Sequence, residues 1–455
     1  MIPPRPISAA RAKAAIILGL ACLASASMAA QATAADPKAA AAKPKSVAVA
    51  LRISPPDALV YELGPDAKPR RLSLIPGANG SRIATLEPGR RELLIEAPGY
   101  ESSRVSLAAA AGAELQAKLE RSGSLLRYEG EGRTGARPKS VSFTPDGKLL
   151  VLPLLSGRGA DLLDAATLER VGALEPPPSF AKAEGFVESA FFPALREIWV
   201  SQMHNSTIHV FDLDSLAYKA SFPSGGSYPK VICPSADGSK AFVTNWVSED
   251  LSVIDAATRV LLAKVKLGGT PRGLAASEDG AWLYIARFAG PGGSAKGGGA
   301  ILRLRLADMR LDTLWPADGG AKRHLVLDER RGRLYATDMG RDSLFAIEAA
   351  TGKLVKEVKL GPNPNACALS PDGSMIYACT RGTNGKRGYE LEGPDAGELI
   401  AIDAESLEIV ARQWGGDQPT GLAVSADGSR LVFTDFLDRR VEAYRAVRPA
   451  ERGMR

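Results

Sequence analysis

Short apolar stretches alternate with polar turns along the chain from residue 122 to residue 447. Each copy of the pattern begins with an apolar stretch, turns at Asp-Gly or a similar dipeptide, and returns as a second apolar stretch. It ends on a segment like Val253-Ile254-Asp255-Ala256-Ala257-Thr258, followed by a stretch rich in Val, Leu and Lys. Apolar runs of this length between turn signals are typical of β-strands. The pattern therefore predicts an all-β region built from repeated units.

The repeat has a period of about 40–55 residues with four short strands, which is typical of one blade of a β-propeller. The first turns of the copies mark seven units: Asp146-Gly147, Leu195-Arg196, Asp237-Gly238, Asp279-Gly280, Arg331-Gly332, Asp372-Gly373 and Asp427-Gly428. We therefore predict a seven-bladed β-propeller over residues 122–447, with a short C-terminal tail, 448–455.

The last copy contains only three strands and ends near Tyr444. The segment Ser124–Glu129 precedes the first copy and has no partner of its own. We predict that this segment supplies the outer strand of the seventh blade, because joining the two ends of the ring removes an exposed sheet edge.

The N-terminus has the features of an export signal. Arg11 and Lys13 precede an apolar run, and two small-residue cleavage sequences follow at residues 24–26 and 32–34. We predict a signal peptide over residues 1–35 and a tether over 36–45, with no further segment that would span a membrane. An alternative is a lipoprotein, in which Cys22 carries the lipid anchor.

Residues 46–121 show short alternating strands separated by Pro-Gly turns, which predicts a small β-sandwich. Pro88-Gly89 and Pro98-Gly99-Tyr100, together with the strands around them, resemble a PEGA domain. That family is an extracytoplasmic module of bacterial envelope proteins, so the resemblance implies location and interaction. The predicted fold class is thus all-β, a seven-bladed β-propeller preceded by a PEGA-like sandwich.

The repeats resemble the YVTN type of β-propeller. The motif position in the second strand is occupied by Phe242-Val243-Thr244-Asn245 and by Tyr335-Ala336-Thr337-Asp338, and Ser370-Pro371-Asp372-Gly373 matches its companion turn. The resemblance covers more than 300 residues. It implies the fold, but this fold supports many unrelated functions.

Composition narrows the function. The net charge of +6 over 455 residues is small and dispersed, which argues against nucleic acid as a partner. Cys233, Cys367 and Cys379 follow the signal segment, an odd number without close spacing. This spacing does not predict a disulfide framework, and buried free thiols are favoured over a Cys367–Cys379 bridge.

In a propeller, the starts of the inner strands and the ends of the second strands meet on one face, around the central channel. The start positions include Lys139, Glu188, Lys230, Arg272, Arg323, His324, Asn365 and Thr420, and the end positions include Asn245, Trp246, Arg287, Phe288, Asp338, Arg381 and Asp435. Cationic and aromatic side chains are frequent anchors of binding surfaces. The candidate partner-binding residues are Lys139, Lys230, Asn245, Trp246, Arg272, Arg287, Phe288, Arg323, His324, Asp338, Arg381 and Asp435.

Two function classes remain open. The first is a monomeric, non-enzymatic binding or scaffold protein of the periplasm or cell surface, whose cationic and aromatic face binds a protein or an anionic glycan, without a cofactor or metal. The second is a hydrolase or lactonase at the channel mouth, for which His324 and Asp338 are the acid–base candidates. A calcium site formed by Glu188, Asn245, Asp338 and Asn365 is a weaker alternative.

Overall fold

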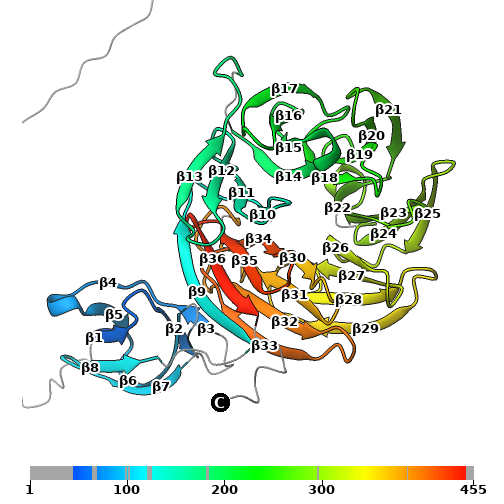
Figure 1. Ribbon diagram of the computed structural model, residues 1–455. Helices are drawn as coiled ribbons and strands as arrows, with labels where there is room; N and C mark the ends of the chain where they lie inside the picture. The colour runs from blue at the N-terminus through cyan, green and yellow to red at the C-terminus, as the bar shows by residue number, and fades with distance from the viewer. Residues whose placement is uncertain are drawn as a thin grey trace, which may run out of the picture. The chain divides into compact units, whose positions relative to one another are not determined.

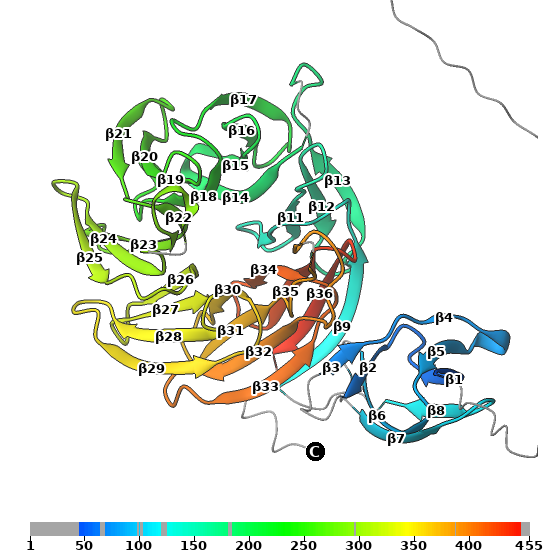
Figure 2. The same cartoon turned by 180° about the vertical axis from the view of Figure 1, so that it is seen from behind.

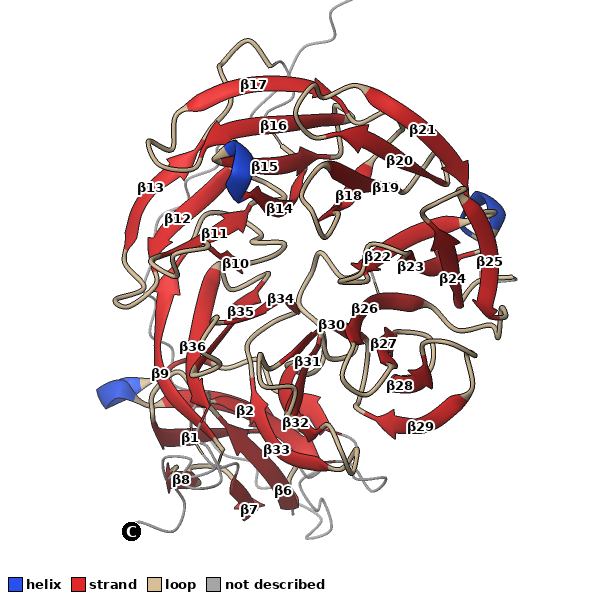
Figure 3. Cartoon of the chain, turned by 45° about the vertical axis from the view of Figure 1, so that its right-hand side comes forward, coloured by secondary structure: helices blue, strands red, loops and turns tan. Residues whose placement is uncertain are grey.

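The computed structural model describes residues 45–63, 69–97, 100, 103–119, 125–180, 184–294, 297–386 and 388–446, all within one compact unit that begins at Lys45. The signal peptide, Cys22, most of the tether and the C-terminal tail lie outside the described residues. The described part is all-β (Figure 3), with three short 3₁₀ helices, η1 Ala78–Gly80, η2 Pro193–Leu195 and η3 Pro291–Gly293. None of the described helices combines the length and apolar character that crossing a bilayer requires.

The first domain is a β-sandwich of two four-stranded sheets, with strand orders β4-β5-β1-β8 and β3-β2-β6-β7. Strand β1 pairs with β5 antiparallel and with β8 parallel. The strands are β1 Val47–Ser54, β2 Leu59–Leu63, β3 Pro69–Arg71, β4 Ile75–Pro76, β5 Arg82–Leu86, β6 Gly89–Glu96, β7 Ser103–Ala109 and β8 Glu114–Lys118.

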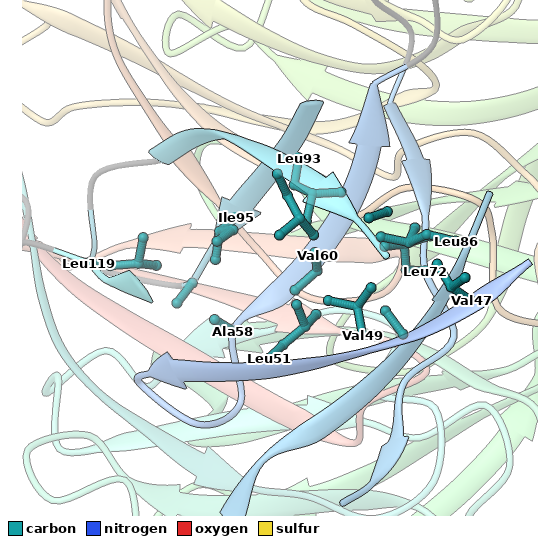
Figure 4. Close-up of a cluster of buried hydrophobic side chains, with 14 residues drawn as sticks. Val47, Val49, Leu51, Ala58, Val60, Leu72, Leu86, Leu93, Ile95 and Leu119 are labelled. Atoms are coloured by element: carbon teal, nitrogen blue, oxygen red, sulfur yellow. The ribbon is translucent and has the colours of Figure 1, made fainter. Parts of the chain in front are cut away.

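The alternation in β1 explains the core of the sandwich. Val47, Val49 and Leu51 are buried, whereas Ala48 between the first two is exposed. The buried side chains meet Val60 and Ile95 from the other sheet in one hydrophobic cluster (Figure 4). Period-two burial on facing sheets is what a sandwich of short strands requires.

The rest of the described chain forms seven four-stranded antiparallel sheets, which we call ring sheets 1 to 7 in chain order. Ring sheets 1 to 3 contain β10 Ser142–Phe143, β11 Leu149–Pro153, β12 Ala160–Asp164, β13 Arg170–Leu174, β14 Phe186–Phe192, β15 Glu197–Gln202, β16 Thr207–Asp212, β17 Tyr218–Pro223, β18 Pro229–Pro234, β19 Lys240–Asn245, β20 Asp250–Asp255 and β21 Leu261–Lys266. Ring sheets 4 and 5 contain β22 Thr270–Ala276, β23 Trp282–Ala289, β24 Ala300–Arg305, β25 Arg310–Trp315, β26 Lys322–Asp328, β27 Arg333–Asp338, β28 Ser343–Glu348 and β29 Leu354–Lys359. Ring sheets 6 and 7 contain β30 Pro364–Leu369, β31 Met375–Thr380, β32 Glu398–Asp403, β33 Ile409–Trp414, β34 Pro419–Val424, β35 Arg430–Asp435, β36 Arg440–Ala446 and β9 Leu126–Arg133.

The sheets close into a propeller-like ring (Figures 1 and 2). Sheet 1 contacts sheet 2 through β11 and β14, each later inner strand contacts the next, and β34 contacts β10. Each of the seven predicted first turns contains one residue with a left-handed backbone conformation. This residue is a glycine in six turns and Arg196 in the other. Asp237 shows how the turn is held, because it accepts hydrogen bonds from the Ser235 hydroxyl at 2.6 Å and the Ser239 amide at 3.0 Å.

The predicted closure of the ring is confirmed. Strand β9 pairs antiparallel with β36 and forms the outer strand of ring sheet 7, with Leu126 opposite Ala446. Arg440 fastens this junction, since it lies 3.2 Å from Glu131 on β9 and 2.7 Å from Glu442 on its own strand. The chain's early and late segments therefore share one sheet.

The sandwich contacts ring sheets 6 and 7. The Ala396 amide donates to the Tyr61 hydroxyl at 2.8 Å, and Arg71 pairs with Asp417 at 2.5 Å. Buried Glu96 lies nearby, and neither of its carboxylate oxygens has a hydrogen-bond partner among the described residues. Burial, with Glu398 and Asp395 adding to it, raises the pKa of Glu96 to about 9.

Candidate functional site

The inner strands bring one residue from each ring sheet to the centre of the ring. Six of these residues are the second or third residue of an inner strand, and Lys139 precedes β10. We call them the central set: Lys139, Glu188, Lys230, Arg272, Arg323, Asn365 and Thr420. Arg272 of sheet 4 lies 3.2 Å from the Glu188 carboxylate of sheet 2, and Arg323 Nε donates to Asn365 Oδ1. The start positions named from the sequence thus meet in space.

A repeated hydroxyl contact positions the central set. Thr244 Oγ1 accepts the Val231 amide of its own sheet at 3.1 Å and donates to the Arg272 carbonyl of the next sheet at 3.0 Å. Ser201 and Thr337 make the same pair of contacts in their sheets. A Thr or Ser hydroxyl near the end of the second strand therefore joins neighbouring sheets at the backbone of the central set.

Residues from six of the seven ring sheets line a central cavity of about 140 Å³. The lining consists of Ser140, Val141, Ser142, Glu188, Arg272, Arg323, His324, Asn365, Ala366, Thr420, Gly421 and Leu422. A cavity of this volume, several times the roughly 30 Å³ of one water molecule, has room for a small polar molecule.

The charges at this centre are unbalanced. Lys139, Arg272, Arg323 and Arg381 are only 3–8% exposed, and Lys230 is half-buried. Among the residues that line the cavity, Glu188 is the one carboxylate. Burying cations together without matching anions is unfavourable, since desolvation and mutual repulsion both oppose the charged forms.

The pKa shifts follow from this imbalance. Burial, then Arg381, Arg323 and the other nearby cations, lowers the pKa of Lys139 well below its ordinary value. Burial lowers the pKa of Arg381 to about 10. Burial, with Arg272 and Arg323 adding to it, lowers the pKa of His324 to about 4, so its imidazole is neutral at neutral pH.

Aromatic rings take the place of carboxylates beside several of these cations. Lys139 Nζ lies 4.8 Å from the Tyr389 ring centroid and 4.6 Å from that of Phe436. Arg381 lies 4.6 Å from the Tyr389 centroid, and Arg323 lies 5.9 Å from that of Phe288. Tyr389 was missed in the sequence, where its only signal is an aromatic residue within a long, polar crossing between β31 and β32.

Comparison with known proteins places the chain in a family. No family model matches the sequence. Over 359 residues it is 37% identical to Antigen Lp49 of Leptospira interrogans serogroup Icterohaemorrhagiae serovar copenhageni, and the match covers 78% of this chain and 77% of that protein. The chain belongs to the Antigen Lp49 family.

A solved structure supports the fold of this Antigen Lp49 relative. The hydrazine synthase of Kuenenia stuttgartiensis superposes with a TM-score of 0.58 at 18% identity, covering 69% of this chain and 97% of the synthase chain. At this level of identity the likeness concerns the fold alone, and it agrees with a propeller-like all-β ring.

Three candidate residues of this Lp49-family chain lie beneath the surface rather than on it. Asn245, Asp338 and Asp435 are fully buried. Asn245 Nδ2 donates to Asp250 at 2.9 Å, Asp338 accepts the Ala321 amide at 2.7 Å, and Asp435 accepts the Gly416 amide at 2.9 Å. The expectation that these side chains face a partner needs correction, because the second strand ends by turning them inward to brace loops.

The remaining strand-end residues form two groups. Trp246 and Phe288 are half-buried and pack against each other with centroids 5.2 Å apart. Arg287 is separate from the central cations, since its guanidinium donates to the carbonyls of Gly268 at 3.2 Å and Gly297 at 2.9 Å. Lys230, Arg272, Arg287 and Arg323 were expected to contribute to one cationic face. Arg287 instead braces a loop, and Arg272 and Arg323 are too buried to form an exposed cationic surface.

The side chains considered for acid–base catalysis, disulfide formation and metal binding do not form such sites. His324 Nδ1 lies 3.7 Å from the sulfur of buried Cys367, whereas Asp338 is bound to Lys322 at 2.6 Å. Cys233, Cys367 and Cys379 are free thiols. Within the described ranges, no group of three or more His, Cys, Asp or Glu side chains is placed to hold a metal ion.

Proposed function

We propose that this chain is an exported, surface-associated binding protein of a bacterial envelope, without enzymatic activity, that recognises a protein or an anionic glycan through one face of its ring. In this proposal residues 46–121 form a PEGA-like module and residues 122–447 a seven-bladed propeller of the YVTN type. The leader-like N-terminus, the Pro-Gly turns and the naming of its relative as an antigen support this assignment.

The observation that carries the proposal is an aromatic surface on ring sheets 3 and 4, which we call the aromatic rim: Tyr228, Lys230, Trp246 and Phe288. Tyr228 is 37% exposed, and Lys230 Nζ lies 5.4 Å from the Trp246 centroid and 6.0 Å from that of Tyr228. Rigid aromatic groups beside a cation are the residue types that anchor protein and glycan partners.

Partner capture tests this proposal. The mature protein would be immobilised and exposed to envelope extract and to a panel of sulfated and carboxylated glycans, beside a Tyr228→Ala/Trp246→Ala variant. A Leu354→Ser variant on the outer strand β29, where Leu354 is 43% exposed, is the matched control. We expect a partner retained by wild type and control and lost by the rim variant. Equal retention by all three proteins would reject the rim as the binding surface.

The hydrolase alternative gains no support from the site. The two acid–base candidates face different partners, Cys367 for His324 and Lys322 for Asp338. A general base must be able to reach the proton that it removes, and these contacts do not place the two groups together.

A further inference from the structure

The central cavity contains more cationic character than the fold requires. A sheet does not need a cation at the start position to join the ring, as Asn365 and Thr420 show in sheets 6 and 7. In sheets 1, 3, 4 and 5 the same position is Lys or Arg. Because these cations oppose one another in a buried site, an interaction outside the ring's own packing is needed to explain them.

Two buried donors at this centre lack partners. Arg272 Nη1 and Arg381 Nε have no hydrogen-bond partner among the described residues, although both side chains are more than nine-tenths buried. Leaving a buried donor unsatisfied typically costs about 1–3 kcal/mol, and more for a charged group. Arg272 is one of the residues that line the cavity, and we take its unsatisfied Nη1 as a contact for an acceptor bound there.

We propose that the central cavity binds a small oxyanion with at least two negative charges, either a phosphate or a di- or tricarboxylate. Arg272 and Arg323 would supply directed donors, because a guanidinium matches carboxylate and phosphate oxygens in pairs. His324 and Asn365 complete the polar wall, and Lys139 and Lys230 add positive charge nearby.

The enclosure of the site selects for a small ligand. Arg272 and Arg323 are 6% and 8% exposed, and the cavity holds about 140 Å³. Groups this buried are out of reach of a folded protein or a glycan chain, so the ligand that we propose is a free anion. The cavity lining shares no residue with the aromatic rim, although Lys230 lies near both, and this proposal does not depend on the partner proposed above.

Glu188 gives the proposal a directional test. Its carboxylate pairs with Arg272 at 3.2 Å and would repel an incoming anion. Glu188→Gln should therefore tighten anion binding by several-fold, whereas Arg323→Gln should weaken it by about tenfold or more. A purely structural role for Glu188 cannot produce tighter binding.

Calorimetric titration and thermal unfolding of the mature protein, at fixed ionic strength in chloride, provide the measurement. Inorganic phosphate and citrate are titrated separately, with Arg310→Gln on exposed β25 as the matched loss of one cation. We expect saturable binding of at least one anion and a melting temperature that this anion raises by about 3 °C or more. Arg310→Gln should bind the anion as wild type does. Anion affinity should rise in Glu188→Gln and fall in Arg323→Gln. Phosphate alone or citrate alone would identify the oxyanion class.

Absence of binding to both anions, or binding that Glu188→Gln weakens, would overturn the proposal. Loss of the aromatic rim's partner in the capture experiment would leave the anion result untouched. The two proposals can therefore fail independently.

Discussion

Two buried lysines in the ring have opposite surroundings. Lys322, at the start of β26, is fully buried, and its ammonium lies 2.6 Å from Asp338 and 2.8 Å from Asp318. Lys139, near the start of ring sheet 1, is 6% exposed and lies beside the rings of Tyr389 and Phe436. In the described part of the chain, no carboxylate lies within ion-pair distance of Lys139.

The difference separates charges that serve the fold from charges that are available to a ligand. Burial alone would raise the pKa of Asp318, yet the Lys322 ammonium and further donors outweigh burial and leave this pKa below its ordinary value. The Lys322 ammonium therefore stabilises both carboxylates, and each carboxylate stabilises the ammonium. Lys139 instead is opposed by its cationic neighbours, so its positive charge lowers the stability of the ring.

Removing the paired lysine should have the largest effect. Lys322→Met would leave Asp338 and Asp318 without their ammonium, and breaking a buried pair typically destabilises by about 3–5 kcal/mol. Denaturant unfolding followed by tryptophan fluorescence measures this change. A loss below about 1 kcal/mol would contradict the structural role given to the pair.

Glu96 in the sandwich tests the same difference between paired and unpaired buried charges, here for a carboxylate. Glu96 has a pKa of about 9 in the folded state, above its ordinary value of 4.5. Its contribution to stability is therefore complete below about pH 4.5 and is lost as the pH rises through 9. In wild type the free energy of unfolding should fall between these two pH values, and in Glu96→Gln this fall should be smaller by about 1–3 kcal/mol.

Chemical denaturation of wild type and Glu96→Gln at pH 5, 7 and 9 measures that difference. Glu87→Gln, on an exposed turn of the same domain, is the control. Identical pH slopes for wild type and Glu96→Gln would show that Glu96 ionises freely.

Removing the unpaired lysine should have the reverse sign of the first change. Lys139→Met keeps an apolar stem beside Tyr389 and Phe436 while it removes an opposed charge, so we expect stability to stay equal or to rise by about 1 kcal/mol. Denaturation in chloride buffer without phosphate provides the measurement. A loss of more than about 2 kcal/mol would place Lys139 with the paired charges.

The smallest effect should come from protonation of His324. Its folded pKa of about 4 lies below the ordinary 6.5, so its contribution to stability is complete above about pH 6.5 and is lost as the pH falls through 4. In His324→Asn the loss of unfolding free energy at acid pH should be smaller than in wild type by about 1 kcal/mol. Melting temperatures between pH 4 and pH 7 provide the check, with His204→Asn as the control.

The sequence predicted the ring well because its signals are local. The left-handed turn residues, from Gly147 to Gly428, stand where the Asp-Gly pattern indicated, and the strand before the first copy closes the ring as expected. A turn depends on a few neighbouring residues, so it can be read without knowledge of distant contacts.

The site was predicted less completely because its contacts join distant segments. The start positions converge as expected, but nothing local reveals that Arg272 reaches Glu188 or that Tyr389 lies beside Lys139. The inward turn of Asn245, Asp338 and Asp435 was also hidden, since a column of strand ends does not show which side chains face loops. The cationic residues that were expected on the surface are instead buried at the centre of the ring.

The pairing of β9 with β36 also affects the order in which the chain can fold during synthesis. During synthesis the β9 strand emerges long before its partner, because the register places Leu126 opposite Ala446. Its edge therefore remains unpaired until Ala446 has been made, and such distant pairings form slowly. A chain that stops before β36 cannot close its ring, so its β9 edge stays open to pairing with other chains.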